Sequence, residues 1–117
     1  MALILAGVLG VLISLAGVWF ITSPFNAVQA FGVDPSHLAD IALAPGIGVR
    51  DVALGLIIIG FAMARKPGAA GTALLITSIV PIGDYVIAGK ALGYAAAVRH
   101  LIALPFLVIL GLVLVRK

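Results

Sequence analysis

The sequence predicts an all-α protein, a four-transmembrane-helix bundle with two short interfacial helices in the first connector. Hydrophobic residues make up 64% of the chain and charged residues 9%, whereas a soluble domain has about 45–50% and about 25%. A chain of 117 residues is too short to bury so much apolar surface in one aqueous core. Its long apolar segments also have the roughly 20 residues that a helix needs to cross a bilayer.

Four apolar segments follow one another in a single integral membrane domain that covers residues 1–117. The predicted spans are residues 2–21, 46–64, 68–89 and 97–115. Helices are favoured over barrel strands because the apolar runs are continuous and do not alternate with period two. The first segment has no basic residue before it and no small-residue cleavage site after it, so we expect a retained span and not a signal peptide.

The connector between the first two spans, residues 22–45, is longer than an unstructured connection usually is. It carries two sets of helix start and stop signals, with Ser or Asp before Pro at each start and Gly or Pro-Gly at each stop. The starts are Ser23-Pro24 and Asp34-Pro35, and the stops are Gly32 and Pro45-Gly46. We expect two short helices on the extracytoplasmic surface, which either cap the bundle or merely connect it.

Basic residues gather at two places that lie on one side of a four-span bundle. Arg65 and Lys66 occupy the turn between the second and third spans, and the chain ends in Arg116 and Lys117. The positive-inside rule then predicts a multi-pass protein of the cell membrane with both termini in the cytoplasm.

The opposite side carries Lys90, in the expected loop, and Arg99, which weaken this bias. Trp19, Tyr85 and Tyr94 fall at the predicted outer boundary, where amphipathic rings are common.

Small residues form a stripe along the first span. Gly7, Gly10, Ser14 and Gly17 are three or four positions apart and therefore share one helical face. Small residues let two helix backbones approach closely, which promotes helix association in lipid. The stripe is expected to pack either within the bundle or against a second copy of the chain in a homo-oligomer.

Charged side chains from three spans are expected at one depth near the extracytoplasmic side. With about 1.5 Å of rise per residue, Arg50 and Asp51 lie one turn into the second span, and Asp84 lies one turn before the end of the third. Arg99 and His100 fall in the first turn of the fourth span. Charges in hydrocarbon usually face the bundle interior and pair, so we expect Arg50 to bind Asp84 or both aspartates.

Proline should shape the helices around these charges. Pro81 has no N–H and clashes with the carbonyl of Thr77, so the third span should kink there. Thr77 and Asp84 share the face of Pro81, which predicts a small polar pocket. Pro105 should bend the fourth span in the same way.

This set of side chains has the components of acid–base catalysis. Two carboxyl groups that share one arginine do not titrate alike, so one can hold a proton while the other accepts one. A histidine at the same level can shuttle the proton. The candidate catalytic residues are Asp51, Asp84, Arg50 and His100, and the candidate substrate-binding residues are Thr77, Arg99, Trp19 and Tyr85.

The function predicted from this pattern is that of a membrane enzyme or binding protein for a lipophilic small molecule. Isomerisation, cyclisation or epoxide opening would suit the residues and needs no cofactor. One alternative is a proton- or cation-coupled small transporter, and another is a structural subunit in which arginine and aspartate only fix helix register. Small multidrug exporters have four spans of similar length but place an essential acid in the first, where residues 2–21 have none.

Several other classes of site are disfavoured. The chain has no cysteine, which excludes disulfides and thiolate metal sites. Asp51, Asp84, His100 and His37 show no metal-ligand spacing, and Arg50 next to Asp51 opposes a bound cation. Phosphate-binding and dinucleotide motifs are absent, and a net charge of +3 gives no reason to expect nucleic acid.

Two short motifs carry a resemblance to known families. Gly-x-Arg-Asp-x-x-x-Gly runs from Gly48 to Gly55, and Pro81-Ile82-Gly83-Asp84 lies near the end of the third span. With four spans and a long first connector, the chain resembles uncharacterised small four-helix membrane proteins akin to the DoxX-like and anthrone-oxygenase-like families. The resemblance implies a four-helix bundle and, in the oxygenase-like branch, action on apolar aromatic or polyketide-type substrates at Arg50, Asp51, Asp84 and His100.

Overall fold

The computed structural model describes residues 1–31 and 38–117, and every element in these ranges is helical. The elements are α1 (Ala2–Thr22), α2 (Pro24–Phe31), α3 (Leu38–Met63), α4 (Pro67–Thr77), α5 (Ile79–Leu92), α6 (Tyr94–Ala97), the 3₁₀-helix η1 (Val98–Leu101) and α7 (Leu104–Val115). Four helical stretches are long and apolar enough to cross a membrane: Ala2–Thr22, Ala42–Met63, Pro67–Lys90 and Val98–Val115. The predicted all-α fold with four candidate spans is therefore confirmed.

Of the two short helices predicted in the first connector, one is present. α2 begins at Pro24, directly after Ser23, whose carbonyl accepts the N–H of Ala27 at 3.0 Å. The second short helix, expected to end at Pro45, is wrong, because residues 38–45 form the beginning of α3 and Pro45 lies inside that helix. Proline removes one backbone hydrogen bond but keeps a helical φ, and membrane helices tolerate it. Gly32 and Asp34-Pro35 lie outside the described residues.

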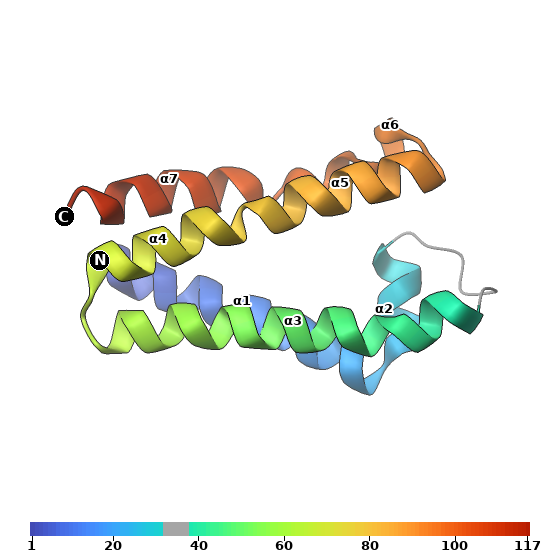
Figure 1. The fold of residues 1–117 in the computed structure, drawn as a ribbon, viewed down its shortest axis with the longest axis horizontal. Helices are drawn as coiled ribbons and strands as arrows, with labels where there is room; N and C mark the ends of the chain where they lie inside the picture. The colour runs from blue at the N-terminus through green and yellow to red at the C-terminus, as the bar shows by residue number, and fades with distance from the viewer. Residues whose placement is uncertain (32–37) are drawn as a thin grey trace.

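Two antiparallel hairpins form two layers (Figure 1). In the first hairpin α1 packs against α3, and in the second α4 and α5 run back alongside α6, η1 and α7. Both chain ends and the turn from α3 to α4 lie at one end of the molecule, here called the terminal end. The opposite end, which carries α2 and α6, is called the distal end.

Close backbone contact holds the first hairpin together. A Cβ atom on Gly10 would lie 2.8 Å from the Gly55 carbonyl oxygen, and one on Gly17 would lie 2.5 Å from that of Gly48. The Gly7/Gly10/Ser14/Gly17 face, expected to pack either within the bundle or against a second copy, packs against α3 of the same chain. The Oγ of Ser14 is buried there, against Gly55.

Close backbone contact at glycine also holds the second hairpin together, a feature that was not expected from the sequence. A Cβ atom on Gly71 would lie 2.7 Å from the Gly111 carbonyl oxygen, so α4 and α7 touch through their backbones. This contact sets the antiparallel register of the two helices.

The apolar core between the two hairpins lies toward the terminal end. Its buried members come from α1, α3, α4 and α7: Ala2, Ala6, Ile58, Ala70, Leu74, Leu107 and Leu114. A second, smaller cluster of Phe20, Ala27, Val28 and Ala44 fixes α2 on α1 and α3 at the distal end.

The helices of the third and fourth spans are both interrupted. Ser78 separates α4 from α5, three residues before Pro81, as the predicted kink requires. In the fourth span, η1 ends at Leu101 and α7 begins at Leu104, with Pro105 in its first turn. Each proline lacks the N–H that would continue the helical hydrogen bonds, which accounts for the interruptions near Pro81 and Pro105.

We expect Gly55→Ala to lower stability by about 1–3 kcal/mol, because the added methyl group would overlap the Gly10 carbonyl oxygen at 2.5 Å and Ser14 in a closely packed contact. Gly60→Ala, five residues further along α3, is the matched control, since nothing lies within 4 Å of its Cβ position. That variant should be neutral or slightly stabilising, as alanine favours helix more than glycine does. Thermal unfolding in detergent measures both; equal midpoints would contradict the close contact between α1 and α3.

Candidate functional site

Arg50 joins two carboxyl groups that come from different hairpins. Its Nε donates a hydrogen bond of 3.0 Å to Oδ1 of Asp51, and its Nη2 lies 3.0 Å from the same oxygen. The same Nη2 lies 3.7 Å from Oδ2 of Asp84, on α5. The predicted pairing of Arg50 with both aspartates is confirmed, and these three residues are called the ion cluster.

Arg50 lies farther from the start of its helix than was expected from the sequence. Because α3 starts at Leu38 and not at Gly46, Arg50 is about 18 Å from the beginning of its helix. It is about 12 Å inside Ala42, where the apolar stretch of α3 begins. Asp84 is about 9 Å from Lys90, the distal end of its own span. Arg50 is therefore farther from the start of its helix than the expected single turn, because α3 begins before Gly46.

Of the two residues expected in the first turn of span four, only His100 approaches the ion cluster. Both lie in η1, a 3₁₀-helix and not an α-helix as expected. The imidazole of His100 is half-buried, its Nε2 is buried, and a positive charge on it would interact favourably with the Asp84 carboxylate. Arg99 is exposed.

The remaining predicted binding residues are placed separately. The Trp19 ring is 43% exposed and packs edge-on against Phe20 at 6.4 Å between centroids. Within the described residues Trp19 makes no hydrogen bond or ion pair with the ion cluster. Tyr85 is next to Asp84 and half-buried, and its ring lies 5.3 Å from that of Tyr94.

Tyr94 in turn covers the backbone at Gly89, where a Cβ atom would overlap its ring. Lys90, expected in a loop, belongs instead to the last turn of α5, because the helix continues past Gly89 before Gly93 ends it with φ +93°.

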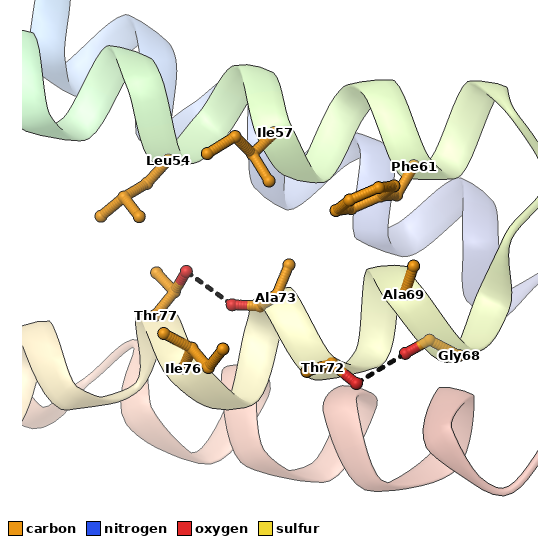
Figure 2. Close-up of a pocket in the computed structure, with 9 residues that line it drawn as sticks. All are labelled: Leu54, Ile57, Phe61, Gly68, Ala69, Thr72, Ala73, Ile76 and Thr77. Atoms are coloured by element: carbon orange, nitrogen blue, oxygen red, sulfur yellow. Dashed lines mark hydrogen bonds between the residues drawn. The ribbon is translucent and has the colours of Figure 1, made fainter.

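A groove of about 390 Å³ lies between α3 and α4, on the terminal side of the ion cluster (Figure 2). Leu54, Ile57 and Phe61 line it from α3, and a row beginning at Gly68 and ending at Thr77 lines it from α4. The hydroxyl groups of Thr72 and Thr77 donate to the carbonyl oxygens of Gly68 and Ala73, at 2.9 and 2.7 Å. The groove therefore presents apolar atoms and leaves these hydroxyl groups satisfied.

The groove ends close to the ion cluster. Leu54, at its distal limit on α3, follows Asp51 by three residues and Arg50 by four, which are the spacings of neighbours on a helix surface. Thr77, the distal limit on α4, is buried directly before the break at Ser78. The groove was not expected from the sequence, because the sequence does not show that Gly68, Ala69 and Ala73 lie opposite Ile57 and Phe61.

The chemical capacity of the site follows from its composition. Arginine has five N–H donors, of which the described contacts use those of Nε and Nη2. The described contacts do not use the N–H groups of Nη1, so a polar group could bind there. Among the described residues no three His, Asp or Glu side chains are grouped to hold a metal ion, and His37 lies outside them.

The chain belongs to a protein family, DUF4267, described as a domain of unknown function, whose model matches residues 10–114. No curated protein and no solved structure matches the chain. The comparisons thus show an uncharacterised family but no DoxX-like or anthrone-oxygenase-like relative.

We expect Arg50→Met to lower the stability of the protein by about 1–3 kcal/mol, because it leaves two carboxyl groups in the membrane span without their cation. Unfolding in detergent at neutral pH measures this. The triple variant Arg50→Met/Asp51→Asn/Asp84→Asn removes every charge of the ion cluster and should recover most of the loss. If the triple variant were as unstable as the single one, the loss would come from the shape of the arginine and not from its charge.

Proposed function

We propose that this DUF4267 protein binds a lipophilic small molecule in the membrane, with the molecule's polar group at the ion cluster and its apolar part in the α3–α4 groove. The observation that carries the proposal is the position of Arg50. It lies between carboxylates of two hairpins, within a membrane-spanning helix, yet its side chain remains 39% exposed.

The geometry of Arg50 exceeds what a structural link between helices requires. Its short contacts go to Asp51, the next residue of its own helix, and these join no two helices. The contact that does join them, to Asp84, is 3.7 Å long, which is beyond hydrogen-bond distance. Among the described contacts the N–H groups of Nη1 have no partner. In hydrocarbon an unsatisfied donor is costly, and a polar group on a ligand would satisfy it.

The groove supplies the second half of the proposed site. Small-molecule sites are largely apolar with a few placed polar groups, and the groove and ion cluster together have this composition. The volume of about 390 Å³ is within the usual range of about 300–1,000 Å³ for ligand pockets. A molecule with an apolar body and one polar end fits this arrangement.

Acid–base chemistry on the bound molecule is the reaction class that these residues support. In an isomerisation, one carboxylate would remove a proton from the ligand, and a carboxyl group would return a proton at another atom. Such a reaction balances without an oxidant, a reductant or a cofactor. The electrostatic interaction of His100 with Asp84 supports a role for the imidazole in moving that proton.

Transport is a weaker candidate because of the core at the terminal end. A proton or cation relay needs polar groups toward both faces of the membrane. Between the hairpins, the terminal half contains a cluster of buried alanine, leucine and isoleucine side chains beside the apolar groove. This packing favours a site that opens toward one side only.

Extraction of the protein purified in detergent, followed by mass spectrometry, should reveal a co-purifying lipophilic compound. Ile57→Trp, which fills the groove, and Asp84→Asn, which changes the ion cluster, should each reduce its amount at least about tenfold, the equivalent of about 1.4 kcal/mol of binding free energy.

Leu56→Trp is the matched control, because Leu56 is 57% exposed and lies next to Ile57 but does not line the groove. The wild-type amount of compound should be retained in this variant. If all three variants carried equal amounts, or if folded protein never carried a compound, the proposed binding function would be wrong.

We propose that the ion cluster opens toward the extracytoplasmic side of the membrane. We expect a single cysteine at Lys90 to react in intact cells with a membrane-impermeant maleimide, since it lies at the distal end. A cysteine at Lys117, at the terminal end, should react only after permeabilisation. The reverse labelling pattern would place the distal end in the cytoplasm.

A further inference from the structure

We propose that residues 79–101, the distal half of the second hairpin, move as one body about a paired hinge, and that the contact between Arg50 and Asp84 holds this body closed against α3. The moving body consists of α5, α6 and η1. The hinge consists of two points in the chain, one at Ser78 and the other at Ile102 and Ala103.

The first hinge point is Ser78, where the backbone keeps helical dihedral angles but the hydrogen bonding along the helix is weakened. Pro81 has no N–H, so the carbonyl of Thr77 lacks its partner four residues ahead. The hydroxyl groups beside the break turn back toward the terminal side: that of Thr77 donates to Ala73, and that of Ser78 donates to Leu75. These side-chain bonds support α4 and do not cross the break to α5.

The second hinge point, at Ile102 and Ala103, lies at the same level along the hairpin as the first. Pro105 cannot donate to the carbonyl of Leu101, and the chain between η1 and α7 is a turn. The antiparallel register set by Gly71 and Gly111 places Thr77 opposite Pro105. Figure 1 shows the junction of α4 with α5 beside the beginning of α7. Two breaks at one level in neighbouring helices form a hinge, whereas one break beside an intact helix would be braced by it.

The proposed moving body is well packed within itself. The Tyr94 ring lies on Gly89 and beside Tyr85, which joins α6 to α5. Ala88 and Ala97 are buried, at 2% and 0% exposure. Motion should therefore concentrate at the hinge and not within the body.

The same body is weakly attached to the rest of the molecule. The large apolar cluster between the hairpins draws its buried members in the second hairpin from α4 and α7 alone. The distal cluster comes from α1, α2 and α3. Neither cluster contains a described residue of 79–101, and the 3.7 Å ion pair of Arg50 with Asp84 connects this body to α3.

Opening of the body would separate Arg50 and Asp51, which stay on α3, from Asp84 and His100, which move with the body. This would give a lipophilic molecule a lateral entrance from the membrane. The hinge itself does not depend on the proposed binding function, because it follows from the helix breaks and the packing alone.

Distances between spin labels in lipid nanodiscs test the hinge directly, and the natural absence of cysteine allows labels at chosen positions. One pair, Leu43 with Ile87, reports across the distal half; a second pair, Met63 with Leu112, reports across the terminal half. All four side chains are exposed. In Asp84→Asn the distal distances should shift to longer values and broaden, while the terminal distances stay as in the wild type.

Pro81→Ala tests the same hinge without touching the charges. It returns an N–H opposite the Thr77 carbonyl and should narrow the distal distribution. The proposal is overturned if Asp84→Asn leaves the distal distances unchanged, or if distal and terminal distances change together. It is likewise overturned if Pro81→Ala leaves the distal width as in the wild type, a result that stays decisive even where Asp84→Asn fails to fold.

Discussion

The fold depends on the close approach of helix backbones at glycine. Lipid provides no hydrophobic drive for helices to associate, so contact between them comes from packing at small residues. Gly10 and Gly17 meet Gly48 and Gly55 in the first hairpin, and Gly71 meets Gly111 in the second. Each hairpin is thereby a unit of its own, and apolar side chains near the terminal end join the two units.

The candidate site lies where this packing stops. Beyond the terminal core, both helices of the second hairpin are interrupted, and polar groups replace apolar ones between the hairpins. Arg50 and Asp51 belong to the glycine-packed hairpin, whereas Asp84 and His100 belong to the interrupted one. The ion cluster is thus built across the two hairpins, a construction that suits the binding of a ligand between them.

The sequence predicted features that depend on local chemistry. Pro24 after Ser23 located α2, Pro81 located the break in span three, and the shared depth of Arg50 and Asp84 predicted their pairing. It was less reliable where tertiary structure overrides local preference. The sequence predicted a helix end at Pro45, but the helix passes through this residue, so α3 begins earlier than expected. The groove required knowledge of which faces of α3 and α4 oppose each other, and one sequence does not contain that information.

The length of α3 has a consequence for the membrane around the protein. Its 26 residues extend about 39 Å, whereas the hydrocarbon layer is about 30 Å thick. A long helix adapts to such a mismatch by tilting or by thickening the bilayer near it. Tilting of α3 would change the position of Arg50 relative to α5. The thickness of the surrounding bilayer, which depends on the lipid composition, would therefore affect the spacing between the two hairpins.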